Sequence, residues 1–248
     1  MSINVPTRVF IIPYRDREEE KKDFIANMQR YLSGENDWEM YFAHQCDTRP
    51  FNRGAMKNIG FLAIKDKYPH HYKDITFIFH DVDNYPRHLG SIPYTTTNGV
   101  VSHFYGFTYT LGGIFAIKGR DFESAKGFPN FWGWGFEDNV IQDRCIRLGF
   151  TIDRTCFFPF NDCENIIHKS DTMVRTYSRE EGFGYKRGNV DDITHLKNCS
   201  WNFDGDLINI THFSSPIQFE NLHFRIHDVK KHGSKVKVGR IRGRPMKF

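Results

Sequence analysis

In the first third of the chain, segments with the apolar pattern of strands alternate with segments that have the apolar spacing of helices. Short apolar runs at 9–12 and 75–79 are typical of buried strands, and the segments between them carry apolar residues at helical spacing. Strands that alternate with helices predict an α/β fold, with a mostly parallel central sheet flanked by helices. In chain order, the expected elements are strand 8–12, helix 18–32, strand 39–44, helix 53–65 and strand 75–79.

The pattern is less regular in the rest of the chain. The polar segment 169–189 contains three glycines, so we expect it to be a mobile loop. The pair Asp204-Gly205 is a hairpin-turn signal within the late strand region. The further expected elements are strands 99–104 and 109–117, helices 120–126 and 139–148, and late strands 202–211 and 219–229.

Two acidic residues directly follow the apolar run at 75–79. Asp81 and Asp83 stand one residue apart, and alternate residues of a strand share a face. Neighbouring carboxylates repel each other unless a cation lies near them. Ligands of α/β sheets bind beyond the carboxyl ends of the strands, so this pair suits a divalent metal that carries a diphosphate. Alone the signal is weak, because acidic loops after strands are common.

The run 131–139 reads Phe-Trp-Gly-Trp-Gly-Phe-Glu-Asp-Asn. Glycine lets the backbone approach a ligand closely, and here the glycines alternate with tryptophans and lead to Glu137 and Asp138. This predicts a site wall that carries a reactive carboxylate. The alternative is a buried aromatic turn that ends in a helix cap, and Trp132 in particular fits a core position.

Six blocks of this chain resemble, in order, the conserved blocks of the β-1,4-galactosyltransferase family. The resemblance covers about residues 8–229 and implies a GT-A fold with metal-dependent, inverting sugar transfer. The matching blocks are 9–17, 51–61, 81–83, the pair 111–113 and 127–130, 132–138, and 166–168.

The resemblance implies a metal site. Asp83 and His168 would bind the cation, and Asp81 would support the nucleotide. We expect Mn²⁺, with Mg²⁺ as the alternative, because carboxylate, imidazole and phosphate ligands suit it. Many family members carry a methionine three residues before the histidine, where this chain has Asn165, so the metal preference stays open.

The resemblance also implies a general base. Asp138 would take the proton of the acceptor hydroxyl, and the positive end of the following helix would keep it ionised. Glu137 would hold the acceptor or order the loop. Asn139 replaces an aspartate that is usual in galactosyltransferases, so the acceptor need not be N-acetylglucosamine. The residues expected at the acceptor are Trp134, Gly135, Glu137, Asp138 and Asn139.

The donor is expected to be a UDP-sugar held by arginines, whose planar donors suit phosphate. Thr110 stands where galactose-using members usually carry tyrosine, and smaller residues in the family go with N-acetylgalactosamine transfer. In a strand, Tyr109 would point to the opposite face from Thr110. We therefore expect galactose or N-acetylgalactosamine as the donor sugar. The residues expected at the donor are Pro13, Arg15, Arg17, Phe51, Arg53, Asp81, Val82, Thr110, Gly113 and Trp134.

Composition allows a sizeable core, with 39% hydrophobic and 16% aromatic residues, and no apolar stretch is long enough to span a membrane. Five cysteines without a Cys-x-x-Cys pair argue against zinc. Residues 230–248 hold eight Lys or Arg and no acid, which leaves 26 basic and 30 acidic residues elsewhere. We expect a single catalytic domain at 1–229 and a basic tail at 230–248 that is flexible or binds acidic surfaces.

These observations predict an inverting glycosyltransferase that moves a hexose or N-acetylhexosamine to a carbohydrate or glycoconjugate acceptor. A glucosyl- or N-acetylglucosaminyltransferase of the same fold is one alternative, and a carbohydrate-binding protein without turnover is another. The tail motif at 242–245 resembles an AT-hook, but the acidic body disfavours specific nucleic-acid binding. Residues 1–6 do not form the apolar h-region of a signal peptide. We expect a soluble, cytoplasmic enzyme, or a Golgi-lumenal one if the family's N-terminal anchor has been removed.

Overall fold

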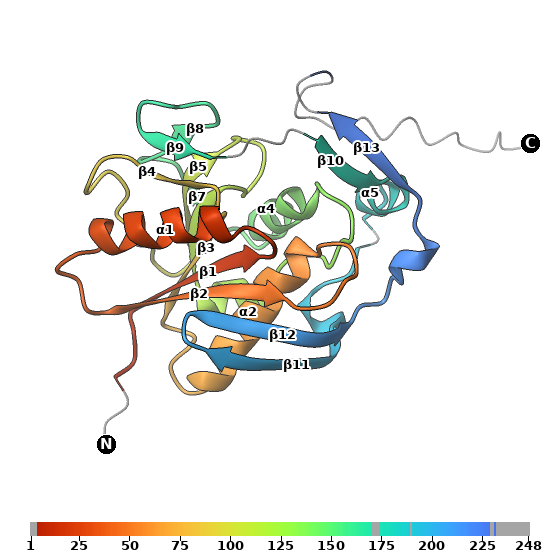
Figure 1. Cartoon of the computed structure of the whole chain (residues 1–248), viewed down its shortest axis with the longest axis horizontal. Helices are drawn as coiled ribbons and strands as arrows, with labels where there is room; N and C mark the ends of the chain where they lie inside the picture. Colours follow the sequence, from red (N-terminus) through yellow and green to blue (C-terminus); the bar gives the residue numbers. More distant parts are fainter. Residues whose placement is uncertain (1–3, 170–173, 189, 229–230, 232–248) are drawn as a thin grey trace, which may run out of the picture.

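The computed structural model describes residues 4–169, 174–188, 190–228 and 231 (Figure 1). The strands are β1 (Arg8–Tyr14), β2 (Trp38–Gln45), β3 (Thr76–His80), β4 (Asn84–Pro86), β5 (Val100–Gly106), β6 (Ile114–Lys118), β7 (Thr151–Asp153), β8 (Phe158–Pro159), β9 (Ile166–His168), β10 (Val174–Ser178), β11 (Lys197–Asp204), β12 (Leu207–Ser214) and β13 (Phe224–Asp228). The helices are α1 (Glu18–Tyr31), α2 (Arg53–Lys67), α3 (Gly119–Ser124), α4 (Glu137–Arg147) and α5 (Arg179–Lys186), with 3-10 turns η1 (Ile193–His195) and η2 (Phe219–Asn221).

The central sheet has the strand order β11-β12-β2-β1-β3-β6-β5-β7, and β8 also pairs with β5. The run β12-β2-β1-β3 is parallel, whereas β6 is antiparallel to both β3 and β5. Two further ribbons, β4 with β9 and β10 with β13, lie outside this sheet. The predicted α/β fold, with a mostly parallel central sheet flanked by helices, is confirmed.

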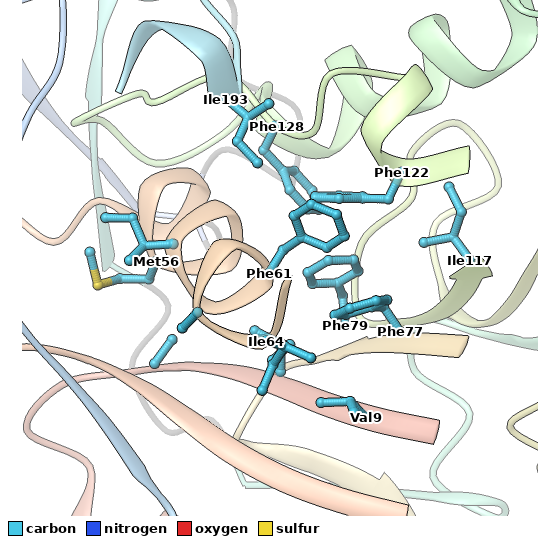
Figure 2. Packing of buried hydrophobic residues seen from close by; sticks show 14 of the residues in the cluster. Val9, Met56, Phe61, Ile64, Phe77, Phe79, Ile117, Phe122, Phe128 and Ile193 are labelled. Atoms are coloured by element: carbon cyan, nitrogen blue, oxygen red, sulfur yellow. The ribbon is translucent and has the colours of Figure 1, made fainter. Parts of the chain in front are cut away.

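Strand β1 is buried on both faces, which explains its continuous apolar run. Val9 and Ile11 belong to the core beneath α2, whereas Phe10 and Ile12 pack in a second cluster with Phe24 of α1. Helices therefore cover both faces of the sheet, and the polar chemistry lies at the ends of the strands. Figure 2 shows the first cluster, in which rings from α2, β3, α3 and the following loop pack together: Phe61, Phe77, Phe79, Phe122 and Phe128.

The predicted strand 109–117 begins only at residue 114, and residues 109–113 form a loop. Gly113 has φ +77°, and a Cβ there would lie 2.5 Å from the carbonyl oxygen of Tyr105. Only glycine tolerates this turn without strain. Tyr109 and Thr110 are therefore not in a strand, so the strand alternation expected for them does not apply, and both line one cavity.

The predicted loop at 169–189 is also wrong for its described part, which contains β10 and α5. Residues 170–173 and 189 lie outside the described residues. Ser178 caps α5 by accepting a hydrogen bond from the N–H of Glu181, and the Glu181 side chain is buried. Glycines lower helix propensity, so this short helix depends on tertiary contacts. Its local sequence does not predict these contacts.

The hairpin turn is confirmed, because the antiparallel strands β11 and β12 are joined by Gly205 and Asp206, with Gly205 at φ +57°. The predicted strand 202–211 is wrong as one strand, since this turn divides it between the end of β11 and the start of β12. The predicted strand 219–229 is divided into the turn η2 and the shorter strand β13. Of the predicted basic tail, only Lys231 is described. The tail and the domain boundary at 229 therefore stay predictions.

Candidate active site

A cavity of about 350 Å³ lies where the ends of the central strands meet the start of α4. Segments that are far apart in the sequence form its wall. The predicted site residues that line it are Arg53, Asp81, Asp83, Thr110, Gly113, Trp134, Gly135, Glu137, Asp138, Asn139 and His168. The predicted site residues outside its wall are Pro13, Arg15, Arg17, Phe51 and Val82.

The predicted metal ligands approach the cavity through the ribbon of β4 and β9. Asn84, the residue after Asp83, pairs with His168 in the antiparallel register, and the N–H of Lys169 donates to the Asp83 carbonyl at 2.6 Å. The Nδ1 atom of His168 lies 3.3 Å from the Tyr105 hydroxyl. A partner at one ring nitrogen orients an imidazole and leaves the other nitrogen for a metal.

Few side chains near this ribbon could serve as metal ligands. Among the described residues, no group of three or more His, Cys, Asp or Glu side chains converges in a way that could hold a metal ion. Asn165 donates its side-chain amide to Asp162 at 3.0 Å and does not line the cavity. Asn84 Oδ1 is buried without a hydrogen-bond partner, so the cavity wall has an unused acceptor beside Asp83. Asp83 and His168 therefore fit a cation only if other ligands, such as phosphate oxygens, complete its shell.

Arg53 is the central cation of the site. Its Nη2 donates to Asp81 Oδ1 at 2.5 Å, and its Nε lies 3.6 Å from Glu137 Oε1. Burial opposes ionisation of Asp81, but the positive charges of Arg53 and Lys57 outweigh it and lower the pKa of this carboxyl. Nε of Arg53 and Oε2 of Glu137 are buried without hydrogen-bond partners. Such unsatisfied groups are costly, so they mark a place where a bound molecule would supply partners.

Glu137 and Asp138 open the first turn of α4, after Phe136 in a left-handed conformation with φ 71°. Burial, followed by the adjacent charge of Asp138, raises the pKa of Glu137 to about 7. Asp138 is more exposed and pairs with the buried Lys57, whose Nζ lies 3.1 Å from Asp138 Oδ1. The two carboxyl groups thus have different environments, a pattern that separates acid and base roles.

The loop 132–134 is held by three consecutive backbone N–H groups. Those of Trp132 and Gly133 donate to the two carboxylate oxygens of Glu181 at 2.6 and 2.8 Å. The N–H of Trp134 donates to the carbonyl of Thr176 at 2.7 Å. Burial raises the pKa of Glu181 to about 8, against the effect of the two N–H groups.

The two tryptophans of this loop lie in different environments. Trp132 is buried and stacks on Phe213 at 5.5 Å, so the core interpretation holds for it. Trp134 lines the cavity, with the Arg175 guanidinium 6.0 Å from its ring. Only the second tryptophan is therefore available to a ligand in this cavity.

The predicted donor residues outside the cavity form their own contacts. Arg15 donates to the carbonyl of Arg49 at 2.5 Å and lies 5.2 Å from the Phe51 ring. Arg17 forms an ion pair with Glu20 at 2.6 Å. Pro13 lies in β1, and Val82 is buried. A donor role for these residues stays a prediction.

Sequence reasoning missed several residues of the site. Lys57 had a usable signal, since it lies four positions after Arg53 and so on the same face of α2. Glu181 had none, because its helix was predicted as a loop. Neither Lys57 nor Glu181 lines the cavity itself, and the cavity residues that the sequence did not single out include Tyr105, Phe107, Phe136, Phe160, Arg175 and Tyr185.

Two family models match the chain. "N-terminal region of glycosyl transferase group 7" matches residues 4–92, and "N-terminal domain of galactosyltransferase" matches residues 95–169. Mouse β-1,4-galactosyltransferase 1 is 30% identical over 79% of this chain and 48% of its own length. The human β-1,4-galactosyltransferase 1 is 32% identical over 75% of this chain and 46% of its own length. The chain therefore spans about half the length of these curated relatives.

Two solved structures have a similar fold. The Drosophila β-1,4-galactosyltransferase 7 catalytic domain with xylobiose has a TM-score of 0.64 at 18% identity, covering 87% of this chain and 97% of that one. A mutant of the same enzyme, in complex with manganese, UDP-Gal and xylobiose, has a TM-score of 0.62 with the same identity and coverage. The fold is that of a GT-A glycosyltransferase. The chain belongs to the β-1,4-galactosyltransferase family. Within the described ranges, every helix is too short or too polar to cross a bilayer.

Proposed function

We propose that this protein is an inverting glycosyltransferase that moves a hexose or N-acetylhexosamine from a UDP-sugar to a sugar hydroxyl. The observation that supports this most is the convergence of Asp83, His168 and Asp138 on one cavity. They come from the end of β3, from β9 and from the start of α4. The related enzyme crystallised with manganese, UDP-Gal and xylobiose supports the same class of donor and acceptor.

A divalent cation is part of the proposal. Asp83 and His168 would hold it, and the diphosphate would add oxygen ligands, the combination that suits Mn²⁺ or Mg²⁺. When bound, the metal supplies charge neutralisation for the departing diphosphate. The unpartnered Asn84 Oδ1 stands beside Asp83 and is available to accept a hydrogen bond from a substrate or a water.

Asp138 is the proposed general base. The acceptor hydroxyl oxygen bonds to the anomeric carbon as the bond from that carbon to the UDP oxygen breaks, and the hydroxyl proton passes to a carboxylate oxygen of Asp138. Glu137, with a pKa raised to about 7 by burial, is the better candidate to stay protonated and to hold the acceptor. Trp134 would cover one face of a sugar in the cavity.

The donor sugar is proposed to be galactose or N-acetylgalactosamine. Thr110 lies in the cavity wall beside the turn of Gly112 and Gly113, and its side chain leaves room that a tyrosine would fill. Arg53 reaches the same cavity with a buried Nε that has no hydrogen-bond partner, which suits a phosphate or sugar oxygen.

The test is a donor screen with Mn²⁺. UDP release and product formation are measured with UDP-galactose, UDP-N-acetylgalactosamine, UDP-glucose and UDP-N-acetylglucosamine and a panel of sugar acceptors. We expect transfer that Asp138→Asn lowers at least about 100-fold while UDP–Mn²⁺ affinity stays nearly intact. Preference for a glucose-type donor would support that alternative. Saturable UDP-sugar binding without turnover would replace the proposal with a carbohydrate-binding protein, and near wild-type transfer by Asp138→Asn would move the base to Glu137.

A further inference from the structure

Lys57 is a buried lysine under the candidate catalytic carboxylates. Its side chain is 2% exposed, in the middle of α2. Nζ lies 3.1 Å from Asp138 Oδ1 and 4.6 Å from the centre of the Phe128 ring. Lysine is almost never fully buried unless it is paired, because removing its charge from water is costly. The contact with Asp138 therefore accounts for the position of this lysine.

The same lysine faces several other charges. Arg53 lies one turn earlier on α2, Asp81 follows β3, and Glu137 precedes Asp138 on α4. Glu181 of α5 is close enough to Glu137 for the charge of Glu137 to raise the pKa of Glu181. Lys57 acts together with Arg53 to lower the pKa of Asp81 and to oppose the rise in that of Glu137. It is thus one of the cations that balance this group of carboxylates.

The two oxygens of Asp138 have separate surroundings. Oδ1 accepts from Lys57, and Oδ2 lies on the side of Gly112, where a Cβ would come within 2.6 Å of it. The backbone carbonyl of the same residue accepts from the N–H of Leu111 at 3.0 Å. Asp138 is therefore fixed by contacts to both its side chain and its backbone.

We propose that Lys57 is a positioning residue for the transfer reaction, which binds Oδ1 of Asp138 and leaves Oδ2 as the oxygen that takes the acceptor proton. This rests on the proposed function. Without the lysine, Asp138 would lose the cation that lies 3.1 Å from its Oδ1, and a carboxylate that loses an opposite charge takes up a proton more readily. The carboxylate of Asp138 would also be freed from its fixed orientation, because Oδ1 would have lost its hydrogen-bond donor.

The experiment measures kcat and KM against pH for wild type and Lys57→Met, with the best donor of the screen. We expect the acid limb of the kcat profile to move up by about one pH unit or more, so that kcat near that limb falls about tenfold and recovers in part at higher pH. KM for the UDP-sugar should change little. Lys57→Arg, which keeps the charge, should restore the position of the acid limb.

Lys65→Met is the matched control. Lys65 lies on the same helix, pairs with Glu123 at 2.5 Å, lies 5.0 Å from the Tyr72 ring and is remote from the cavity. Its loss should leave the pH profile unchanged. In an Asp138→Asn background, Lys57→Met should lower kcat no further, because it acts through Asp138.

The outcomes separate two failures. If wild type transfers no sugar, the proposed function is wrong. If wild type is active and folded Lys57→Met keeps the wild-type pH profile, or adds its full loss to that of Asp138→Asn, only the positioning role is wrong. Thermal unfolding reports whether Lys57→Met folds. If it does not, Lys57→Gln removes the same charge and keeps a donor, and its pH profile must shift in the same direction.

Discussion

Gly112→Ala should displace the candidate base without changing any charge. A Cβ at this position would lie 2.6 Å from Asp138 Oδ2 and 3.2 Å from its Cγ. An ordinary contact begins at 3.4 Å, so the carboxylate must move by about 0.8 Å. The φ of Gly112 is outside the left-handed region, so the alanine would not need a left-handed backbone. The side chain of Asp138 is 21% exposed and can move, so the substitution should displace the carboxylate rather than destabilise the fold.

The expected result is a loss in kcat of about 10- to 100-fold, because a misplacement near 1 Å can cost 10²-fold. That range corresponds to about 1.4–2.7 kcal/mol in the activation free energy. The same shift would change the 3.1 Å contact between Asp138 and Lys57. The assay compares kcat and KM for sugar transfer, with UDP–Mn²⁺ affinity by calorimetry as a check that the donor site is intact.

Gly60→Ala is the control with an equal overlap. Its Cβ would lie 2.6 Å from Ile11 Cγ2, in the core between α2 and β1. It should lower the free energy of unfolding by about 1–3 kcal/mol, as overpacking does, and leave the kcat of the folded protein unchanged. If Gly112→Ala kept wild-type kcat while a crystal structure showed the Asp138 carboxylate displaced, the reasoning about this oxygen would be refuted.

Three more predictions follow from the site. Asp83→Ala should abolish Mn²⁺-dependent UDP-sugar binding in calorimetry, because the cation joins protein and diphosphate; unchanged affinity would remove Asp83 from the metal site. Thr110→Tyr should lower the ratio of kcat/KM for UDP-N-acetylgalactosamine over UDP-galactose by excluding the N-acetyl group. A ratio that does not respond would show that this residue does not select at C2. Glu137 has its pKa raised from 4.5 to about 7 in the folded chain, so the folded state holds a proton that the unfolded state releases. The free energy of unfolding should therefore fall as pH rises from about 5 to 7. Glu137→Gln should flatten this fall in urea unfolding, and equal pH slopes in both proteins would contradict the assignment.

The fold could be predicted well where the residue pattern of a single segment reflects its own burial. Val9 to Ile12 and the run before Asp81 are apolar because both faces of a central strand are covered, and this pattern needs no knowledge of distant residues. The prediction failed at 109–113 and in α5. In the first case a pair of glycines turned an apolar segment away from the sheet, and in the second a glycine-containing polar segment became helical through contacts with the loop 132–134.

The candidate site divides in the same way. The sequence by itself determined which residues bear chemistry, because Asp-x-Asp after a strand and the Trp-Gly run before two acids are local patterns of residue type and spacing. Only the tertiary structure decided which of them meet. Lys57 and Asp138 lie on different helices, and Glu181 reaches back to Trp132 from a helix that the sequence did not predict. The physical reason is that periodicity reflects the environment of one element at a time, whereas ion pairs and hydrogen bonds between distant segments depend on how the elements pack around the sheet.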